Sequence, residues 1–73
     1  MAFRAIKSEI TGSLWKLVKA VGDAVEEDEP IMILESMKME IPVVADAKGM
    51  VKELLVKEGD PVAEGQIVAV VET

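Results

Sequence analysis

The hydrophobic residues of this chain fall into short runs that are separated by turn-forming residues. Examples are IMIL at residues 31–34 and IVAVV at residues 67–71, which are rich in β-branched side chains. Such runs favour strands, and their length between turn signals is typical of strands rather than helices. The turn signals occur at residues 22–23, 46–49, 59–60 and 64–65. This pattern predicts about seven or eight strands in an all-β sandwich or flattened barrel.

The same pattern occurs twice along the chain. Residues 12–36 read GSLWKLVKAVGDAVEEDEPIMILES and residues 49–73 read GMVKELLVKEGDPVAEGQIVAVVET, and the two align without a gap at an offset of 37 residues. Identical residues occur at Gly12/Gly49, Leu17/Leu54, Gly22/Gly59, Asp23/Asp60, Val25/Val62, Glu27/Glu64 and Glu35/Glu72. Two copies are too few for a solenoid. We therefore predict one pseudo-twofold domain over residues 1–73, in which two halves interlock around a common core.

The repeat also decides between helix and strand for the segment LESMKMEI at residues 34–41. By itself this segment has the spacing of a helix at Leu34, Met37 and Ile41. Its counterpart in the second copy leads in with QIVAVVE, which favours a strand. Pro30 and Pro42 leave a stretch that is short for a helix and sufficient for a strand, a turn and a new strand. We predict a hairpin whose turn lies near Met37 and Lys38.

This predicted turn lacks the residues that tight hairpins prefer. Two-residue hairpin turns need positive φ and are usually built from Asn-Gly, Asp-Gly or another glycine pair, yet the residues here are Ser, Met, Lys and Met. Departures from local rules tend to occur at functional or strained sites. One interpretation is an ordinary solvated hairpin in which Met37 or Met39 fills the core. The other is that Lys38 is displayed for covalent modification.

The segment ESMKME at residues 35–40, placed at the end of the first of two such repeats, resembles the attachment hairpin of the biotinyl/lipoyl domain family. The resemblance extends from about Ile6 to Glu72. It implies a flattened barrel of two four-stranded antiparallel sheets, with biotin joined as an amide to Lys38. It also implies that a biotin protein ligase recognises the flanking residues Glu35, Ser36, Met37, Met39 and Glu40.

The resemblance implies a carrier rather than an enzyme. A biotin carboxyl carrier moves carboxylate between a biotin carboxylase and a carboxyltransferase. We expect a carrier of the type that lacks a protruding thumb, because the two copies align without an insertion. We also expect the isolated protein to be a monomer. A lipoyl carrier, or one that accepts both biotin and lipoate on Lys38, is the first alternative. An unmodified β-domain that acts as an interaction module is the second.

Three positions depart from the family's usual pattern. The first repeat is entered through EITG at residues 9–12 instead of Pro-Met-x-Gly, and Ser36 stands where alanine is common. The glycine at position 65 has Asp28 as its counterpart in the first copy. Because only glycine adopts positive φ without a steric cost, we expect the turn at Asp28 to be built differently from the turn at Gly65.

Charge and composition exclude several other classes. A net charge of −6 and only two aromatic residues, Phe3 and Trp15, disfavour binding to nucleic acid or to an anionic membrane surface. The chain has no cysteine and no histidine, which removes disulfides, thiolate nucleophiles and the usual zinc ligands. No apolar run approaches the length of a membrane span. We expect a cytoplasmic protein without a bound metal.

Two further features have competing interpretations. The acidic run at residues 26–29 lacks the ligand spacing of a calcium loop, so we interpret it as a solvated turn. Trp15 is either a mostly buried core residue, with Lys16 and Lys19 on the solvent side, or a contact for a partner protein.

Overall fold

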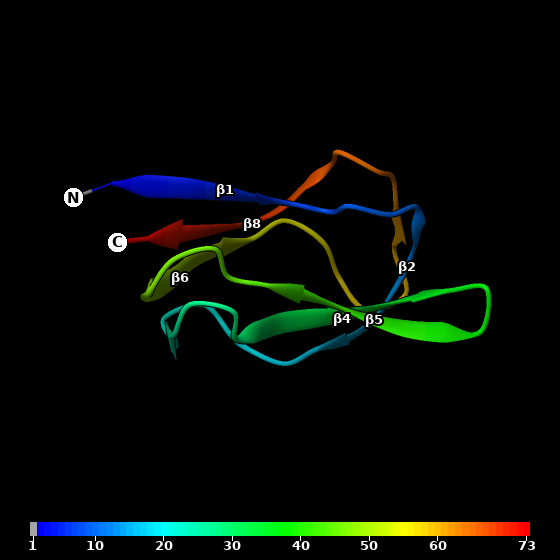
Figure 1. Ribbon diagram of the computed structural model, residues 1–73, viewed down its shortest axis with the longest axis horizontal. Helices are drawn as coiled ribbons and strands as arrows, with labels where there is room; N and C mark the ends of the chain where they lie inside the picture. Colours follow the sequence, from blue (N-terminus) through cyan, green and yellow to red (C-terminus); the bar gives the residue numbers. More distant parts are fainter. Residues whose placement is uncertain (1) are drawn as a thin grey trace.

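The computed structural model describes residues 2–73, and Figure 1 shows them as an elongated structure built from strands. The strands are β1 (Phe3–Lys7), β2 (Gly12–Leu17), β3 (Ala24–Val25), β4 (Pro30–Ser36), β5 (Met39–Val44), β6 (Gly49–Leu54), β7 (Pro61–Val62) and β8 (Ile67–Glu72). They form two four-stranded antiparallel sheets with the orders β1-β8-β6-β3 and β5-β4-β2-β7. The predicted all-β class and the two-sheet architecture are confirmed.

The core lies between the two sheets and uses equivalent positions of the two copies. Leu14 lies opposite Leu34 in one sheet, and Val51 lies opposite Val71 in the other. All four side chains are fully buried. Because successive side chains of a strand point to opposite faces, the residues between them reach the surface. The strands β4 and β8 depart from this rule at equivalent positions, since Ile31 and Met32 are both buried, as are Val68 and Ala69.

The two halves interlock through hydrogen bonds that recur at the 37-residue offset. The Gly22 N–H donates to the Val51 carbonyl at 2.8 Å, and the Gly59 N–H donates to the Leu14 carbonyl at 2.7 Å. The short strands follow the same exchange, since β3 of the first half pairs with β6 of the second and β7 of the second half pairs with β2 of the first. Neither sheet is therefore built from one half alone.

The predicted Gly-Asp turns have the expected geometry. Gly22 and Gly59 both have a φ of +95°. The aspartate that follows each glycine accepts a hydrogen bond at 2.9 Å from the backbone N–H three residues earlier. The glycine thus supplies the left-handed backbone, and the carboxylate closes the turn.

The expectation of a differently built turn at Asp28 is wrong. Asp28 has a φ of +67° and its counterpart Gly65 a φ of +85°. Their N–H groups make equivalent bonds, to the Ala45 carbonyl and the Ser8 carbonyl, both at 2.8 Å. Aspartate tolerates the left-handed region because its short polar side chain can bond locally. The turn therefore keeps its shape without glycine.

Trp15 lies on the surface, so its interpretation as a core residue is wrong. The register of β2 against β4 passes from Leu14 directly to Lys16, which leaves Trp15 as the extra residue of a β-bulge. A bulge bends the strand and redirects the side chain at that position. The Trp15 side chain is consequently 48% exposed. A partner contact at Trp15 stays a prediction.

The acidic run at residues 26–29 forms a turn on the surface. The Glu29 carboxylate lies 3.0 Å from the Lys19 ammonium, and the Glu26 carboxylate lies 3.9 Å from the Lys48 ammonium. Within residues 2–73, no group of three or more acidic, cysteine or histidine side chains is arranged to hold a metal ion. The same residues contain no helix that could span a membrane.

An ion pair ties the outer strand β1 to the turn that follows β5. The Arg4 guanidinium donates two hydrogen bonds to the Asp46 carboxylate, at 2.9 Å from Nε and 3.0 Å from Nη2. The hydrogen bond from Arg4, aided by charge attraction, holds the pKa of Asp46 below its ordinary value. Both side chains are about half exposed, so the pair is accessible to solvent and to screening by salt.

We predict that Leu14→Ala lowers the free energy of unfolding by about 2–5 kcal/mol, because it removes a fully buried side chain and leaves a cavity. The control is Leu55→Ala, which makes the same chemical change at a side chain that is 49% exposed. The measurement is the midpoint of urea denaturation. Equal losses for the two variants would contradict the assigned core.

We predict that Asp46→Asn lowers stability at neutral pH and that its effect diminishes in acid. A carboxyl whose folded pKa is depressed contributes stability above its unfolded pKa of about 3.9, and this contribution is lost as the pH falls through the folded value. Urea midpoints of the two proteins should therefore converge between pH 7 and about pH 3. Glu27→Gln, at an exposed position, serves as the control.

Candidate functional site

Lys38 occupies the turn between β4 and β5, at one end of the molecule. The structure measures 36 × 19 × 18 Å along its principal axes. Figure 1 shows the β4–β5 hairpin at one end of the long axis and both chain ends, beside β1 and β8, at the other. The turn is thus the part of the domain that projects farthest from the chain ends.

The turn consists of Met37 and Lys38 alone, since Ser36 and Met39 form the last pair of the hairpin. Met37 has a φ of +52° and Lys38 a φ of +66°. Positive φ at both central residues is the signature of a type I′ turn, whose twist matches that of the strands. The left-handed conformation costs a residue with a side chain about 1–2 kcal/mol. The hairpin therefore holds its two turn residues in an unfavourable conformation.

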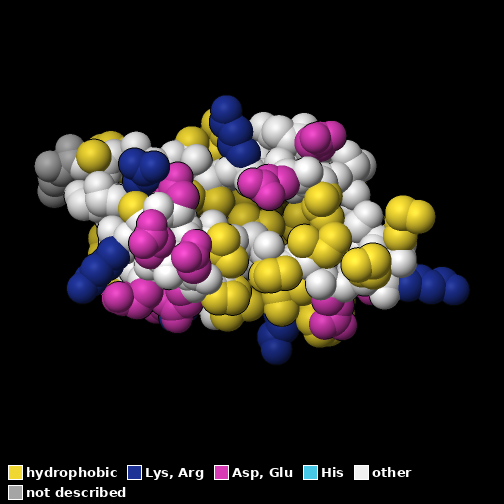
Figure 2. Space-filling model, in the orientation of Figure 1, with side chains coloured by type: hydrophobic (Ala, Val, Ile, Leu, Met, Phe, Trp, Pro, Cys, Tyr) yellow, Lys and Arg dark blue, Asp and Glu magenta, His cyan; other side chains and the backbone are white. Residues whose placement is uncertain are grey.

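The methionines that flank Lys38 are exposed, so their interpretation as core residues is wrong. Met37 is 91% exposed and Met39 is 62% exposed, whereas Met32 of the same hairpin is fully buried. Figure 2 shows hydrophobic side chains and one basic side chain projecting at the hairpin end. Exposed thioethers next to a lysine form an apolar surface on which another protein can pack.

The remaining predicted residues lie on the same tip. Glu35 and Glu40 are directly opposite each other in the register, and both are exposed. Like charges in such a pair are destabilising, so this arrangement does not serve the stability of the hairpin. Ser36 is half-buried beside the turn. Lys38 takes part in none of the ion pairs among residues 2–73, and its ammonium group remains available.

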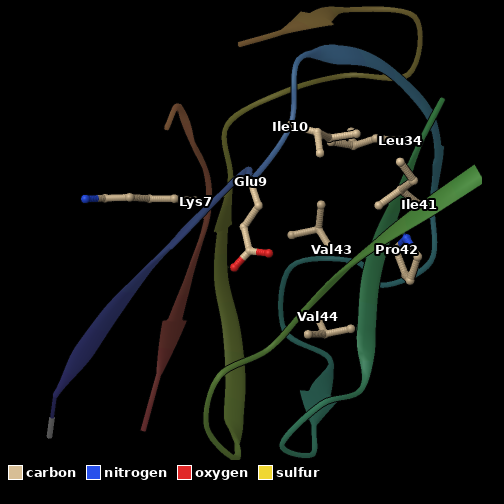
Figure 3. A pocket seen from close by; sticks show the side chains of 8 residues that line it. All are labelled: Lys7, Glu9, Ile10, Leu34, Ile41, Pro42, Val43 and Val44. Carbon is tan, nitrogen blue, oxygen red and sulfur yellow. The ribbon is translucent and has the colours of Figure 1, made fainter. Parts of the chain in front are cut away.

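The sequence did not indicate a second feature, a shallow groove beside the hairpin. It has a volume of about 130 Å³ and lies between the loop after β1 and the strands β4 and β5 (Figure 3). Its lining residues are Lys7, Glu9, Ile10, Leu34, Ile41, Pro42, Val43 and Val44. The only local sequence signal is the apolar character of most of these residues, because the groove joins segments about thirty residues apart.

Comparison with known proteins identifies close relatives. The family model described as "Biotin-requiring enzyme" matches residues 4–71. The biotin/lipoyl attachment protein of Bacillus subtilis is 50% identical over 62 residues, which make up 85% of this chain and 85% of that protein.

Solved structures with the same fold include parts of larger assemblies. The crystal structure of Kluyveromyces lactis urea carboxylase matches with a TM-score of 0.94 and 43% identity, over 99% of this chain and only 6% of that one. The lipoyl domain of the 2-oxoglutarate dehydrogenase complex from Azotobacter vinelandii matches with a TM-score of 0.72 and 32% identity, over 86% of this chain and 80% of that one.

We predict that replacing Met37-Lys38 by Asn-Gly raises the free energy of unfolding by about 1 kcal/mol, because these residues adopt positive φ at a lower cost. The converse control is Gly65→Ala, at a φ of +85° with open space around the added Cβ. It should lower stability by a similar amount. Urea denaturation measures both. A neutral or destabilising effect of Asn-Gly would contradict the strain assigned to the turn.

Proposed function

We propose that this chain, which belongs to the biotin/lipoyl attachment family, carries biotin as an amide on Lys38. Membership of the family confirms the resemblance drawn from the residues, and it makes the chain a carrier domain rather than an enzyme. The observation that supports Lys38 as the acceptor is its position on a two-residue turn of positive φ, between two exposed methionines, at one end of the long axis.

The attachment chemistry requires a neutral amine and an activated acid. An exposed lysine is almost wholly protonated near neutral pH, and only its neutral form is nucleophilic. The chain has no histidine that could act as the base. A biotin protein ligase therefore supplies both the base and biotinyl-adenylate. The Nζ atom attacks the acyl carbon, the adenylate leaves as AMP, and the amine loses a proton.

The flanking residues provide the recognition surface for that ligase. Met37 and Met39 offer apolar contacts, Glu35 and Glu40 offer negative charge, and Ser36 offers a hydroxyl group. The two-residue turn holds these groups in one arrangement before the ligase binds. Such preorganisation reduces the entropy lost on binding.

After attachment, biotin supplies the chemistry of accepting and delivering carboxylate. The chain contributes the projecting hairpin to which biotin is attached. Its hairpin projects along the long axis, so the tip can enter a partner's site while the bulk of the domain stays outside. Tethering also keeps the carried group at a high effective concentration and prevents its loss to solvent.

The proposed partners are a biotin protein ligase, a biotin carboxylase and a carboxyltransferase. The relative from Kluyveromyces lactis is a urea carboxylase, in which the matching region is a small part of a large chain. This supports a carboxylase as the destination of the carried group. A monomeric state and a cytoplasmic location stay predictions.

Lipoate is the second candidate for Lys38. The relative from Bacillus subtilis is named a biotin/lipoyl attachment protein, and the fold also matches a lipoyl domain. The same exposed amine accepts either acid, so the choice depends on which ligase recognises the tip. The methionines on both sides of Lys38 favour biotin.

We predict that co-expression with a biotin protein ligase and excess biotin adds a single biotin-sized increment to the intact mass, and that Lys38→Arg abolishes it. Lys48→Arg is the matched control, because Lys48 is an exposed lysine in another turn. It should be modified as fully as the wild type.

The alternatives give different results in the same experiment. A lipoyl-sized increment with a lipoate ligase, and no increment with a biotin ligase, would make lipoate the carried group and 2-oxoacid dehydrogenases the proposed partners. No increment on folded protein with an active ligase would reject the biotin proposal and favour an interaction module, for which Lys38→Arg is harmless.

A further inference from the structure

The groove beside the hairpin combines an apolar floor with one acidic group. Its floor is formed by Ile41 and Val43 of β5, together with Leu34 of β4 and Ile10 of the loop after β1. Figure 3 shows the Glu9 side chain directed toward the region of Val43, whereas the Lys7 side chain extends away from the other lining residues. The strands β1 and β5 are the outer strands of their sheets, so the groove opens along the seam between the two sheets.

The internal repeat shows why this groove is open. At the 37-residue offset, Ile41 corresponds to Arg4 and Glu9 corresponds to Asp46. Arg4 and Asp46 form a bidentate ion pair at the symmetry-equivalent place. At the groove, Ile41 stands where Arg4 stands in that pair. Glu9 takes part in none of the ion pairs among residues 2–73, and Ile10 and Ile41 of the groove are only partly buried.

The size of the groove indicates what it can hold. Its volume of about 130 Å³ is well below the ~300–1,000 Å³ of sites that bind free small molecules. Such a groove fits one ring of a ligand and binds it weakly. It becomes significant for a group that is already held close by a covalent bond, because a short tether gives an effective concentration in the mM range.

The position of the groove relative to Lys38 satisfies this condition. Ile41 follows Lys38 by three residues along β5, a separation of about 10 Å in a strand. A lysine side chain with an attached valeryl chain contains about eleven bonds from Cα to the ring, comparable in contour to three or four extended residues, or about 12 Å. The arm on Lys38 is therefore long enough to fold back to Ile41.

We propose that the groove is a resting site for the ring of biotin attached to Lys38, an inference that rests on the proposed function. The ureido ring has two N–H donors, and the Glu9 carboxylate is an acceptor without a partner in the groove. The hydrocarbon and thioether part of the ring packs on Ile41 and Ile10, which are only partly buried. The dithiolane ring of lipoate has no N–H group, so Glu9 favours biotin over lipoate at this place.

The test compares biotinylated and unmodified ¹⁵N-labelled protein by amide chemical shifts, with loading verified by intact mass. Hairpin amides will shift in any loaded protein, so the decisive signals are those of Ile10, Val43 and Val44, which line the groove. We expect these to shift on loading. We also expect the loaded protein to associate with streptavidin about twofold more slowly than a protein without the groove. The reason is that an effective concentration of the ring in the mM range and a dissociation constant of the groove in the mM range give about half occupancy.

Two variants isolate the groove. Ile41→Arg places an arginine beside Glu9, as Arg4 lies beside Asp46 at the equivalent position. The spectrum of the unmodified variant reports whether the variant folds. It should load normally, lose the groove shifts and accelerate streptavidin capture about twofold. Glu9→Gln changes an exposed side chain and should weaken the groove shifts. Val21→Arg, at an exposed residue outside the groove, is the control and should behave as the wild type.

The outcomes separate the two proposals. A protein that fails to load would overturn the proposed function and the inference with it. A loaded protein whose Ile10, Val43 and Val44 signals match those of the unmodified form would overturn the inference alone. Groove shifts that persist unchanged in a folded, loaded Ile41→Arg variant would overturn it as well.

Discussion

The structure depends on the exchange of backbone hydrogen bonds between its two halves. The turn of each half donates to a long strand of the other, as the Gly22 and Gly59 N–H groups do, and each short strand completes the opposite sheet. Because neither sheet forms without both halves, the domain folds around one core of equivalent side chains. This arrangement stabilises a chain of 73 residues without disulfides, at a length where the surface buried on folding is limited.

The same pairing places the lysine. Ala2 and Thr73 exchange two backbone hydrogen bonds, at 3.3 and 2.8 Å. At the 37-residue offset they correspond to Met39 and Ser36, the last pair before the turn. The chain ends and the Met37-Lys38 turn are therefore equivalent positions at opposite ends of the molecule. Lys38 lies in the connection between two equivalent halves, where both turn residues adopt positive φ at a cost in stability.

Departures from the internal symmetry lie close to this connection. On one side of the molecule, Arg4 and Asp46 close the seam between the two sheets. Beside the lysine hairpin, Ile41 and Glu9 occupy the positions equivalent to Arg4 and Asp46 and leave a groove. The exposed methionines and the opposed pair of glutamates add to this asymmetry. One end of this pseudo-twofold scaffold thus has a closed seam, and the other has a groove beside the exposed hairpin.

The sequence by itself determined the strands, the Gly-Asp turns and the lysine hairpin. These features depend on neighbouring residues, on the preference of β-branched residues for strands and on a repeat whose alignment needs no gap. Only the tertiary structure decided that Trp15 is exposed, since a β-bulge depends on the partner strand. It also decided the positive φ of Asp28, since an aspartate can adopt the backbone conformation of a glycine. It also decided the Arg4–Asp46 pair and the groove at Glu9 and Ile41, because these contacts join segments that are distant in the chain and are fixed by the packing of one sheet against the other.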